Sequence, residues 1–142
     1  MWTNPATLPK ASRWSKGRAG RGAGLGLDII EVSRIKAVAR RTPLFLSRVF
    51  APEEIRYCRA KKKPWPHFAA RFAAKEAVWK ALGHGGVALK DIRVERDDLG
   101  RPYVIVQGRV RRDLDLSLTH TERYAAAVAL ASGKSRSWPP PP

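Results

Sequence analysis

Apolar residues recur at helical spacing in residues 67–82. At 3.6 residues per turn, the large side chains of this segment fall in one stripe and its alanines fall in another. The stripes are Phe68, Phe72, Trp79 and Leu82, and Ala70, Ala74, Ala77 and Ala81. Two stripes predict a helix that is buried on more than one side and approaches a neighbour closely on its alanine side. We expect the rest of the chain to be organised around this helix.

Smaller elements are predicted on both sides of the central helix. Before it, the pattern indicates a buried strand, an amphipathic helix and two short helices, over residues 24–30, 31–41, 44–49 and 52–59. After it, alternating residues indicate four strands, over 91–96, 103–106, 114–118 and 124–131. Turns are expected at 97–102 and 119–121. This order predicts an α+β fold, with a small, mostly antiparallel sheet packed on the long central helix.

The chain of 142 residues is long enough for one domain with a core, which we place at residues 23–132. Residues 1–22 hold five basic residues, no acid and no periodicity, so they are expected to form a disordered basic arm. The proline-rich residues 133–142 are expected to form a disordered tail. The single cysteine, Cys58, permits no intramolecular disulfide, and no apolar run is long enough to span a bilayer, so a cytoplasmic protein is expected.

The charge of the chain indicates an anionic partner. The formal net charge is +16, and much of it remains without the two terminal segments. Candidate partners are nucleic acid, a phosphorylated cofactor, an acidic protein or an anionic membrane. A small basic nucleic-acid-binding protein is the main alternative to an enzyme. Against it, the aromatic residues of the central helix lie in its core stripe rather than among exposed basic residues, where stacking on bases would require them.

Two carboxylates stand in places where a charge is costly. Asp28 is expected at the end of the first strand, and Glu76 lies in the middle of the central helix among apolar residues. Two carboxylates, together with water and phosphate oxygens, suit Mg²⁺. Asp28 could instead cap the following helix, and Glu76 could form an ordinary surface ion pair with Lys80 four residues later. Lys75 projects into the aromatic stripe, where a charge must be paired or put to use.

Motifs for nucleotide or zinc binding are absent from the sequence, which has no Walker loop, no dinucleotide-binding glycine pattern and no Cys/His zinc spacing. Other segments are informative: GLGLDIIEVSRI at 24–35, RVFAPEE at 48–54, RFAAKEAVWKALG at 71–83, DIRV…GRPYV at 91–104 and LSLTHTERYAAAVAL at 116–130. In this order they resemble the bacterial holo-acyl-carrier-protein synthase family of 4′-phosphopantetheinyl transferases. The resemblance covers nearly all of residues 23–131. It implies transfer of 4′-phosphopantetheine from coenzyme A to a serine of apo-acyl carrier protein, with release of adenosine 3′,5′-bisphosphate.

The resemblance also implies roles for individual residues. Asp28 and Glu76 would hold Mg²⁺ against the diphosphate, Glu76 or a water on the metal would accept the serine proton, and Lys80 would stabilise the departing phosphate. The coenzyme A-binding residues would be Arg71, Lys75, Lys80, Gly100, Arg101, Pro102, His120 and Thr121. The role of Lys75 stays open between structure and phosphate pairing. His120 could also be a hydrogen-bonded turn residue, and the lysines at 61–63 could contact phosphate or form a solvated loop.

The family's partners account for the basic surface without nucleic acid or a membrane, since coenzyme A and the carrier protein are both anionic. Arg34 and Arg41 match the helix that docks the carrier's acidic helix. Short members of the family form homotrimers in which neighbours share each site. His84 stands where the family usually has threonine, which places nucleotide contacts at this loop in question. A member that binds coenzyme A without turnover is an alternative, but the motif acids and lysines are all present. Fatty acid synthesis and a secondary pathway both remain open.

Overall fold

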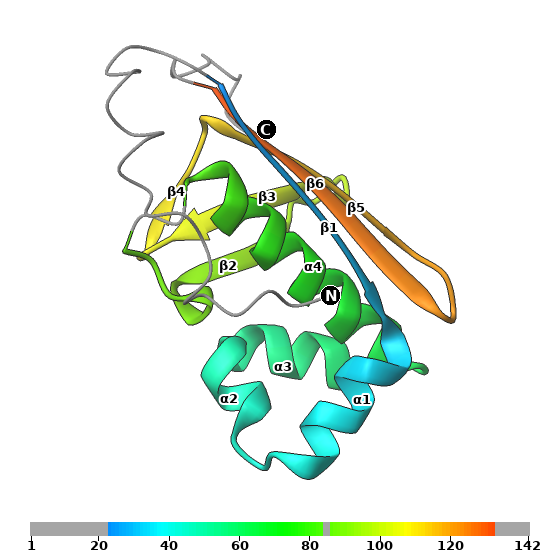
Figure 1. The fold of residues 1–142 in the computed structure, drawn as a ribbon. Helices are drawn as coiled ribbons and strands as arrows, with labels where there is room; N and C mark the ends of the chain where they lie inside the picture. Colours follow the sequence, from blue (N-terminus) through cyan, green and yellow to red (C-terminus); the bar gives the residue numbers. More distant parts are fainter. Residues whose placement is uncertain (1–22, 84–85, 133–142) are drawn as a thin grey trace.

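One long helix, α4 (Pro64–Ala81), lies between two three-stranded sheets in the computed structural model, which describes residues 23–83 and 86–132 (Figure 1). The larger sheet has the order β1 (Gly24–Glu31), β6 (Tyr124–Ala131), β5 (Leu114–His120). The smaller sheet has the order β2 (Ile92–Arg96), β3 (Pro102–Val106), β4 (Arg109–Val110). Neighbouring strands are antiparallel in both sheets. The α+β fold expected from the sequence is therefore confirmed.

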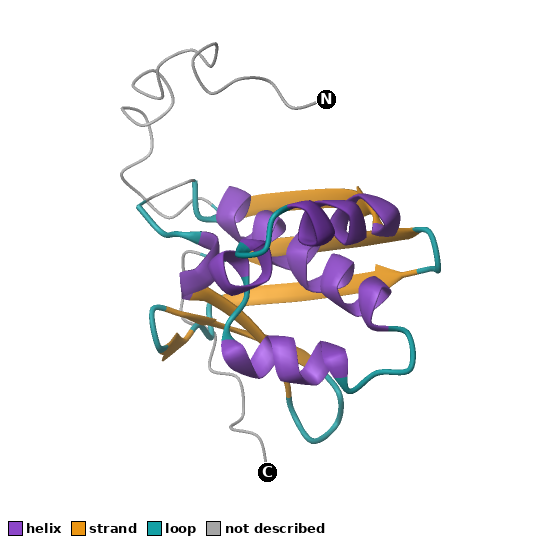
Figure 2. Cartoon of the chain, turned by 90° about the horizontal axis from the view of Figure 1, so that it is seen from below, coloured by secondary structure: helices purple, strands orange, loops and turns teal. Residues whose placement is uncertain are grey.

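Three shorter helices precede α4 and cluster beside its N-terminal half (Figure 1). They are α1 (Val32–Arg41), α2 (Phe45–Val49) and α3 (Pro52–Arg59), and a short 3₁₀ turn, η3 (Leu89–Asp91), precedes β2. Figure 2 shows that the helices gather over one face of the long strands. Two apolar clusters fill the space between these layers, one around the C-terminal half of α4 and one around its N-terminal half.

The alanine stripe of α4 packs directly on β1, as its small side chains predict. A Cβ atom added to Gly26 would lie 1.7 Å from the carbonyl oxygen of Ala77, and one added to Gly24 would lie 2.0 Å from that of Ala81. Real atoms do not approach so closely, so glycine is required at both strand positions. This contact brings the middle of β1 against the C-terminal half of α4.

Several boundaries differ from the sequence prediction. Helix α4 begins at Pro64 rather than His67. Proline is favourable at the first helical position, because the N–H group that it lacks would have no partner within the helix. Strand β5 extends to His120, which pairs with Ala125 and therefore does not lie in the turn. The two-residue strand β4 was not predicted.

Asp28 lies inside β1 rather than at the end of a strand, and it pairs with Ala127. The N-cap of α1 is Glu31. The prediction that placed Asp28 at a strand end was therefore wrong, and its alternative role as a helix cap is excluded.

Some predictions lie outside the described residues: the basic arm at 1–22, the tail at 133–142, and His84. In the part of the chain that is described, no helix combines the length and the apolar character needed to cross a membrane.

Candidate functional site

Asp28, Glu76 and Lys80 gather where β1 meets the C-terminal half of α4. The Lys80 ammonium donates to the Leu27 carbonyl oxygen at 2.9 Å and to Asp28 Oδ1 at 3.2 Å. Lys80 therefore binds the strand rather than forming the simple pair with Glu76 that its spacing allowed. The side chain of Asp28 is 17% exposed and that of Lys80 is 41% exposed, so the cluster remains accessible to a ligand.

Both carboxylates of this cluster are perturbed by their surroundings. Burial raises the pKa of Glu76, and the nearby Asp28 carboxylate raises it further, while Lys80 opposes both effects. Burial also raises the pKa of Asp28, although Lys80 and then Arg34 act in the opposite direction. Because the charge of Asp28 acts on Glu76, the two acids lie close together, as a shared ligand requires.

The donor set of this cluster fits a hard divalent cation. In the described residues, no group of three or more His, Cys, Asp or Glu side chains is arranged to hold a metal. Mg²⁺ does not need such a group, because it is usually bound by one or two carboxylates, with water and substrate phosphates completing its octahedron. Asp28 and Glu76 are suitable as the protein's two ligands.

Lys75 lies next to Glu76 in sequence but is fully buried. Its ammonium lies 2.6 Å from Glu54 Oε2 and donates to the carbonyl oxygens of Val49, Leu89 and Ile92. Burial lowers the pKa of Lys75, and the charge of Glu54 opposes this effect. Of the two roles left open by the sequence, this environment favours the structural one.

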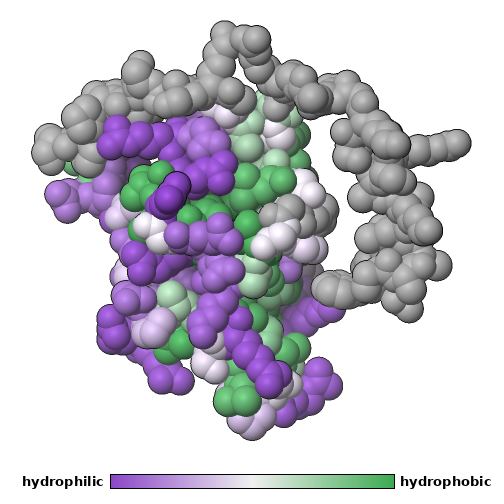
Figure 3. Space-filling view, turned by 90° about the vertical axis from the view of Figure 1, so that its left-hand side faces the viewer, coloured by the Kyte–Doolittle hydropathy of each residue, from purple (hydrophilic) through white to green (hydrophobic). Residues whose placement is uncertain are grey.

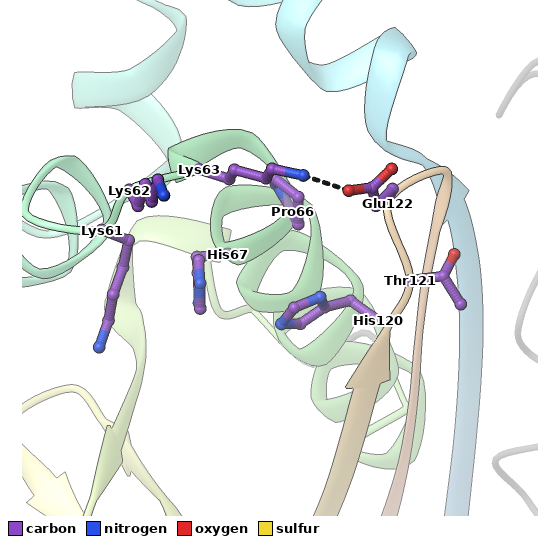
Figure 4. Close-up of a pocket in the computed structure, with 8 residues that line it drawn as sticks. All are labelled: Lys61, Lys62, Lys63, Pro66, His67, His120, Thr121 and Glu122. Atoms are coloured by element: carbon purple, nitrogen blue, oxygen red, sulfur yellow. Dashed lines mark hydrogen bonds and ion pairs between the residues drawn. The ribbon is translucent and has the colours of Figure 1, made fainter.

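A second group of residues lines a cavity of about 510 Å³ near the N-terminus of α4 (Figure 4). The residues come from the loop before α4, from its first turns, and from the end of β5 with the turn after it. They are Lys61, Lys62, Lys63, Pro66, His67, His120, Thr121 and Glu122. Lys63 is paired with Glu122 across the cavity. The lining formed by the described residues is therefore strongly basic, and its one carboxylate, Glu122, already has a cationic partner.

Arg71 lies one turn after His67 on α4 and is 4% exposed. Its guanidinium carbon lies 3.9 Å from the centre of the Tyr57 ring. Within the described residues, its Nε has no hydrogen-bond partner and no carboxylate lies within ion-pair distance of its guanidinium. A buried cation without an anion is costly, so this position favours an anionic ligand.

The turn between β2 and β3 carries Gly100, Arg101 and Pro102. Asp97 holds this turn, since its Oδ1 accepts from the backbone N–H groups of Leu99 and Arg101 at 2.9 and 2.8 Å. Gly100 has a φ of +78°, which glycine adopts without strain. Arg96 donates to the Gly100 carbonyl oxygen at 2.7 Å, and its charge lowers the pKa of His67. The turn therefore lies on the same side of α4 as the cavity.

The candidate residues thus form two groups on opposite sides of α4. His67 and Glu76 are nine residues apart, which is about two and a half helical turns, so they project in opposite directions. Asp28 lies on β1 and His120 on β5, with β6 between these strands. One protomer therefore does not bring the carboxylate pair and the basic cavity into a single site.

The two arginines predicted to bind a carrier protein are both exposed on α1. The charge of Arg34 lowers the pKa of Asp28, so Arg34 lies near that carboxylate. Arg41 lies farther along, at the last position of α1. The exposed surface of α1 thus adjoins the carboxylate pair.

Sequence reasoning did not find three residues of these arrangements, which are Glu54, Tyr57 and His67. Glu54 falls within the short helix predicted at 52–59, and His67 begins the segment predicted to form the central helix. No local pattern marks them, because their contacts join segments that are distant in sequence. The lysines at 61–63 did stand out in the sequence, which left phosphate contact and a solvated loop as their two interpretations.

Comparisons with known proteins identify the family to which this chain belongs. Residues 24–129 match the family model of the 4′-phosphopantetheinyl transferase superfamily. A holo-[acyl-carrier-protein] synthase of Moorella thermoacetica is 47% identical over 115 residues, covering 74% of this chain and 90% of the relative. One from Caldanaerobacter subterraneus is 40% identical over 123 residues, covering 80% and 97%. The chain belongs to this superfamily and, within it, to the holo-[acyl-carrier-protein] synthases, which are transferases.

Solved structures show the same fold. A holo-(acyl-carrier-protein) synthase from Bacillus anthracis, in complex with CoA (3′,5′-ADP), has a TM-score of 0.70 and 32% identity and covers 81% of this chain and 100% of its own. A Helicobacter pylori holo-[acyl-carrier-protein] synthase in complex with coenzyme A has a TM-score of 0.63 and 28% identity, covering 74% and 96%. The family resemblance found in the sequence is therefore confirmed.

Proposed function

We propose that this protein transfers 4′-phosphopantetheine from coenzyme A to a serine of an apo-acyl carrier protein, in a Mg²⁺-dependent reaction that releases adenosine 3′,5′-bisphosphate. The observation that carries the proposal is the meeting of Asp28 and Glu76, which come from distant parts of the sequence yet lie close enough for the Asp28 charge to raise the pKa of Glu76. Membership of the holo-[acyl-carrier-protein] synthases supports the same reaction.

The carboxylate cluster supplies the groups that the reaction needs. A divalent cation bound by Asp28 and Glu76 would neutralise charge on the diphosphate of coenzyme A. Glu76 accepts the proton of the attacking serine hydroxyl as the bond from serine oxygen to phosphorus forms. Lys80 stabilises the phosphate oxygen of the departing adenosine 3′,5′-bisphosphate. Its bonds to the Leu27 carbonyl and to Asp28 hold its ammonium beside the two acids.

The basic cavity receives the other phosphate of coenzyme A, the monoester on the ribose. Arg71, His120 and Thr121 contribute to this side, and the Gly100–Arg101–Pro102 turn lies along the adenosine. The buried guanidinium of Arg71, which has no carboxylate partner among the described residues, supports an anion here. Lys75 contributes through packing, because its ammonium is already surrounded by oxygen atoms.

The separation of the two groups supports an active site shared between neighbouring chains of a homotrimer. In coenzyme A, a single ribose joins the diphosphate to the monoester phosphate, so the two phosphate groups are close together. One molecule therefore cannot place them on opposite sides of the same α4 helix. A second protomer that presents its cavity to the first protomer's carboxylates resolves this conflict.

An apolar surface is available for such an assembly. Leu25, Leu27 and Ile29 are exposed by 64–69% on the face of β1 that points away from α4. Val128 lies beside Leu27 on β6 and is 39% exposed. Figure 3 shows another side of the molecule, on which hydrophilic residues gather toward the left and apolar residues toward the centre and right. A continuous apolar strand surface next to a carboxylate pair is suited to contact between copies.

The carrier protein would bind at α1. Arg34 and Arg41 are exposed there, and α1 also carries Lys36 and Arg40. Because Arg34 lies near Asp28, an acidic helix bound to α1 would bring its serine close to the carboxylates. This arrangement supports an acidic protein partner rather than nucleic acid.

Incubation of the purified protein with coenzyme A, Mg²⁺ and an apo-acyl carrier protein tests the proposal. Mass spectrometry of the carrier should show a gain equal to one phosphopantetheine group. The control is a carrier whose acceptor serine is replaced by alanine. If the unsubstituted carrier gains no mass under conditions in which the protein is folded, the proposed reaction is wrong.

A further inference from the structure

His67 and His120 form a ring pair at the basic cavity. Their ring centres are 4.9 Å apart, with the planes at 65°. His67 comes from the first turns of α4 and His120 from the end of β5. Figure 4 shows Lys61, His67 and His120 directed toward the same space below the loop. Two imidazoles and an ammonium from three separate elements thus converge on this space.

The groups around His67 are almost all cationic or neutral. They are Lys61, Lys62 and Lys63 from the loop, Tyr57 from α3, Arg71 on α4, Arg96 from β2, His120 from β5, and Glu122 from the turn after β5. Glu122 is the single carboxylate in the described lining of the cavity, and Lys63 is paired with it. Tyr57 presents its ring edge-on to His67 at 6.2 Å between centres.

This environment disfavours the charged form of the His67 ring while the cavity holds no anion. Burial lowers the pKa of His67, and the charges of His120, Lys61, Arg71 and Arg96 lower it further. A phosphate dianion would reverse the effect of these charges, because its two negative charges favour the imidazolium. A neutral imidazole also offers only one N–H group, whereas the imidazolium offers two to a ligand that only accepts.

We propose that His67 is a further phosphate-binding residue, which takes up a proton from solvent when the ribose phosphate monoester of coenzyme A enters the cavity. The acid form of the buffer gives up one proton, which forms a new N–H bond on the imidazole, and the imidazolium then donates to a phosphate oxygen. No bond between heavier atoms forms or breaks. The proposal rests on the proposed function, and it adds a residue that distinguishes coenzyme A from dephospho-coenzyme A.

Isothermal titration calorimetry of the full chain counts the protons taken up. Coenzyme A is titrated at about pH 7 in two buffers that differ in ionisation enthalpy, since the difference in observed heat gives the number of protons bound. We expect net proton uptake with coenzyme A, and weaker binding without uptake for dephospho-coenzyme A. Equal affinity and equal proton count for the two ligands would overturn the proposal.

Two variants assign the proton to His67. His67→Phe keeps an aromatic ring against Tyr57 and His120, and His67→Gln keeps an N–H donor that does not titrate. Both should abolish the uptake, and His67→Phe should weaken coenzyme A binding about tenfold at about pH 6.5, as for loss of one charge-assisted hydrogen bond. At about pH 8, where an imidazole holds its proton less readily than at pH 6.5, the loss should shrink to about twofold.

The outcomes separate this inference from the proposed function. If the parent and both variants take up the same number of protons, His67 is not the titrating group and the inference is wrong, while the transferase proposal stands. If the folded parent binds neither coenzyme A nor dephospho-coenzyme A, the proposed function fails and this inference fails with it.

Discussion

The buried ion pair between Lys75 and Glu54 allows one prediction to be worked out in detail. Both side chains are at most 1% exposed, and Lys75 Nζ lies 2.6 Å from Glu54 Oε2. Glu54 also accepts hydrogen bonds from the backbone N–H groups of Ala51 and Val94, at 2.9 and 3.0 Å. The pair therefore joins α3 and β2 to the middle of α4.

Lys75→Met removes the cation while nearly preserving the shape of the side chain. It leaves Glu54 buried without its charge partner, and it removes the donor from three carbonyl oxygens. Breaking a buried pair in this way costs about 3–5 kcal/mol. Because whole domains are stable by only about 5–15 kcal/mol, the variant should unfold at a much lower urea concentration.

The matched control is Lys80→Met, the same substitution five residues later on α4. The Lys80 side chain is 41% exposed, so its removal should change the free energy of unfolding by less than about 1 kcal/mol. The double substitution Glu54→Leu/Lys75→Met should recover much of the loss, because it leaves no unpaired buried charge. Urea unfolding is followed by circular dichroism at one protein concentration, since assembly would also affect stability.

The reasoning would be refuted if Lys75→Met unfolded at the same urea concentration as the parent but bound coenzyme A far more weakly. That result would return Lys75 to the coenzyme A-binding residues named by the family resemblance. Equal losses of stability in Lys75→Met and Lys80→Met would also contradict it, because burial would then make no difference.

Four further predictions concern the site and the fold. Glu76→Gln should abolish phosphopantetheine transfer while leaving the circular dichroism spectrum unchanged, and normal Mg²⁺-dependent activity would remove the metal assignment. Arg34→Glu should raise KM for the carrier protein far more than KM for coenzyme A; similar increases would exclude a carrier-specific role. Leu27→Asp should convert the assembly to monomers in analytical ultracentrifugation and abolish transfer, whereas an unchanged assembly would place the interface elsewhere. Gly26→Ala should destabilise the fold by about 3 kcal/mol or more, because the new methyl group meets the Ala77 carbonyl, and unchanged urea unfolding would contradict that contact.

Much of the architecture was accessible from the sequence because it depends on local patterns. The alanine stripe of the central helix predicted a close approach, and Gly24 and Gly26 of β1 are the residues it meets. Helix α3 and strand β6 have the predicted boundaries, since proline begins the helix and a continuous apolar run forms the strand. The motifs also indicated the family, because their residues stand in a recognisable order and spacing along the sequence.

Other features depend on contacts that no short segment contains. The partner of Lys75 is Glu54, 21 positions earlier, and only the packing of α3 against α4 brings them together. His67 gains its significance from His120, which belongs to a strand at the other end of the chain.

The sequence by itself therefore determined most of the elements, the family and the chemical types of the candidate residues, because periodicity and motif spacing are local properties. The tertiary structure decided which charges are buried, which are paired, and on which side of α4 each one lies. Those properties arise when distant segments exclude water together, and they divide the candidate residues into a carboxylate cluster and a basic cavity.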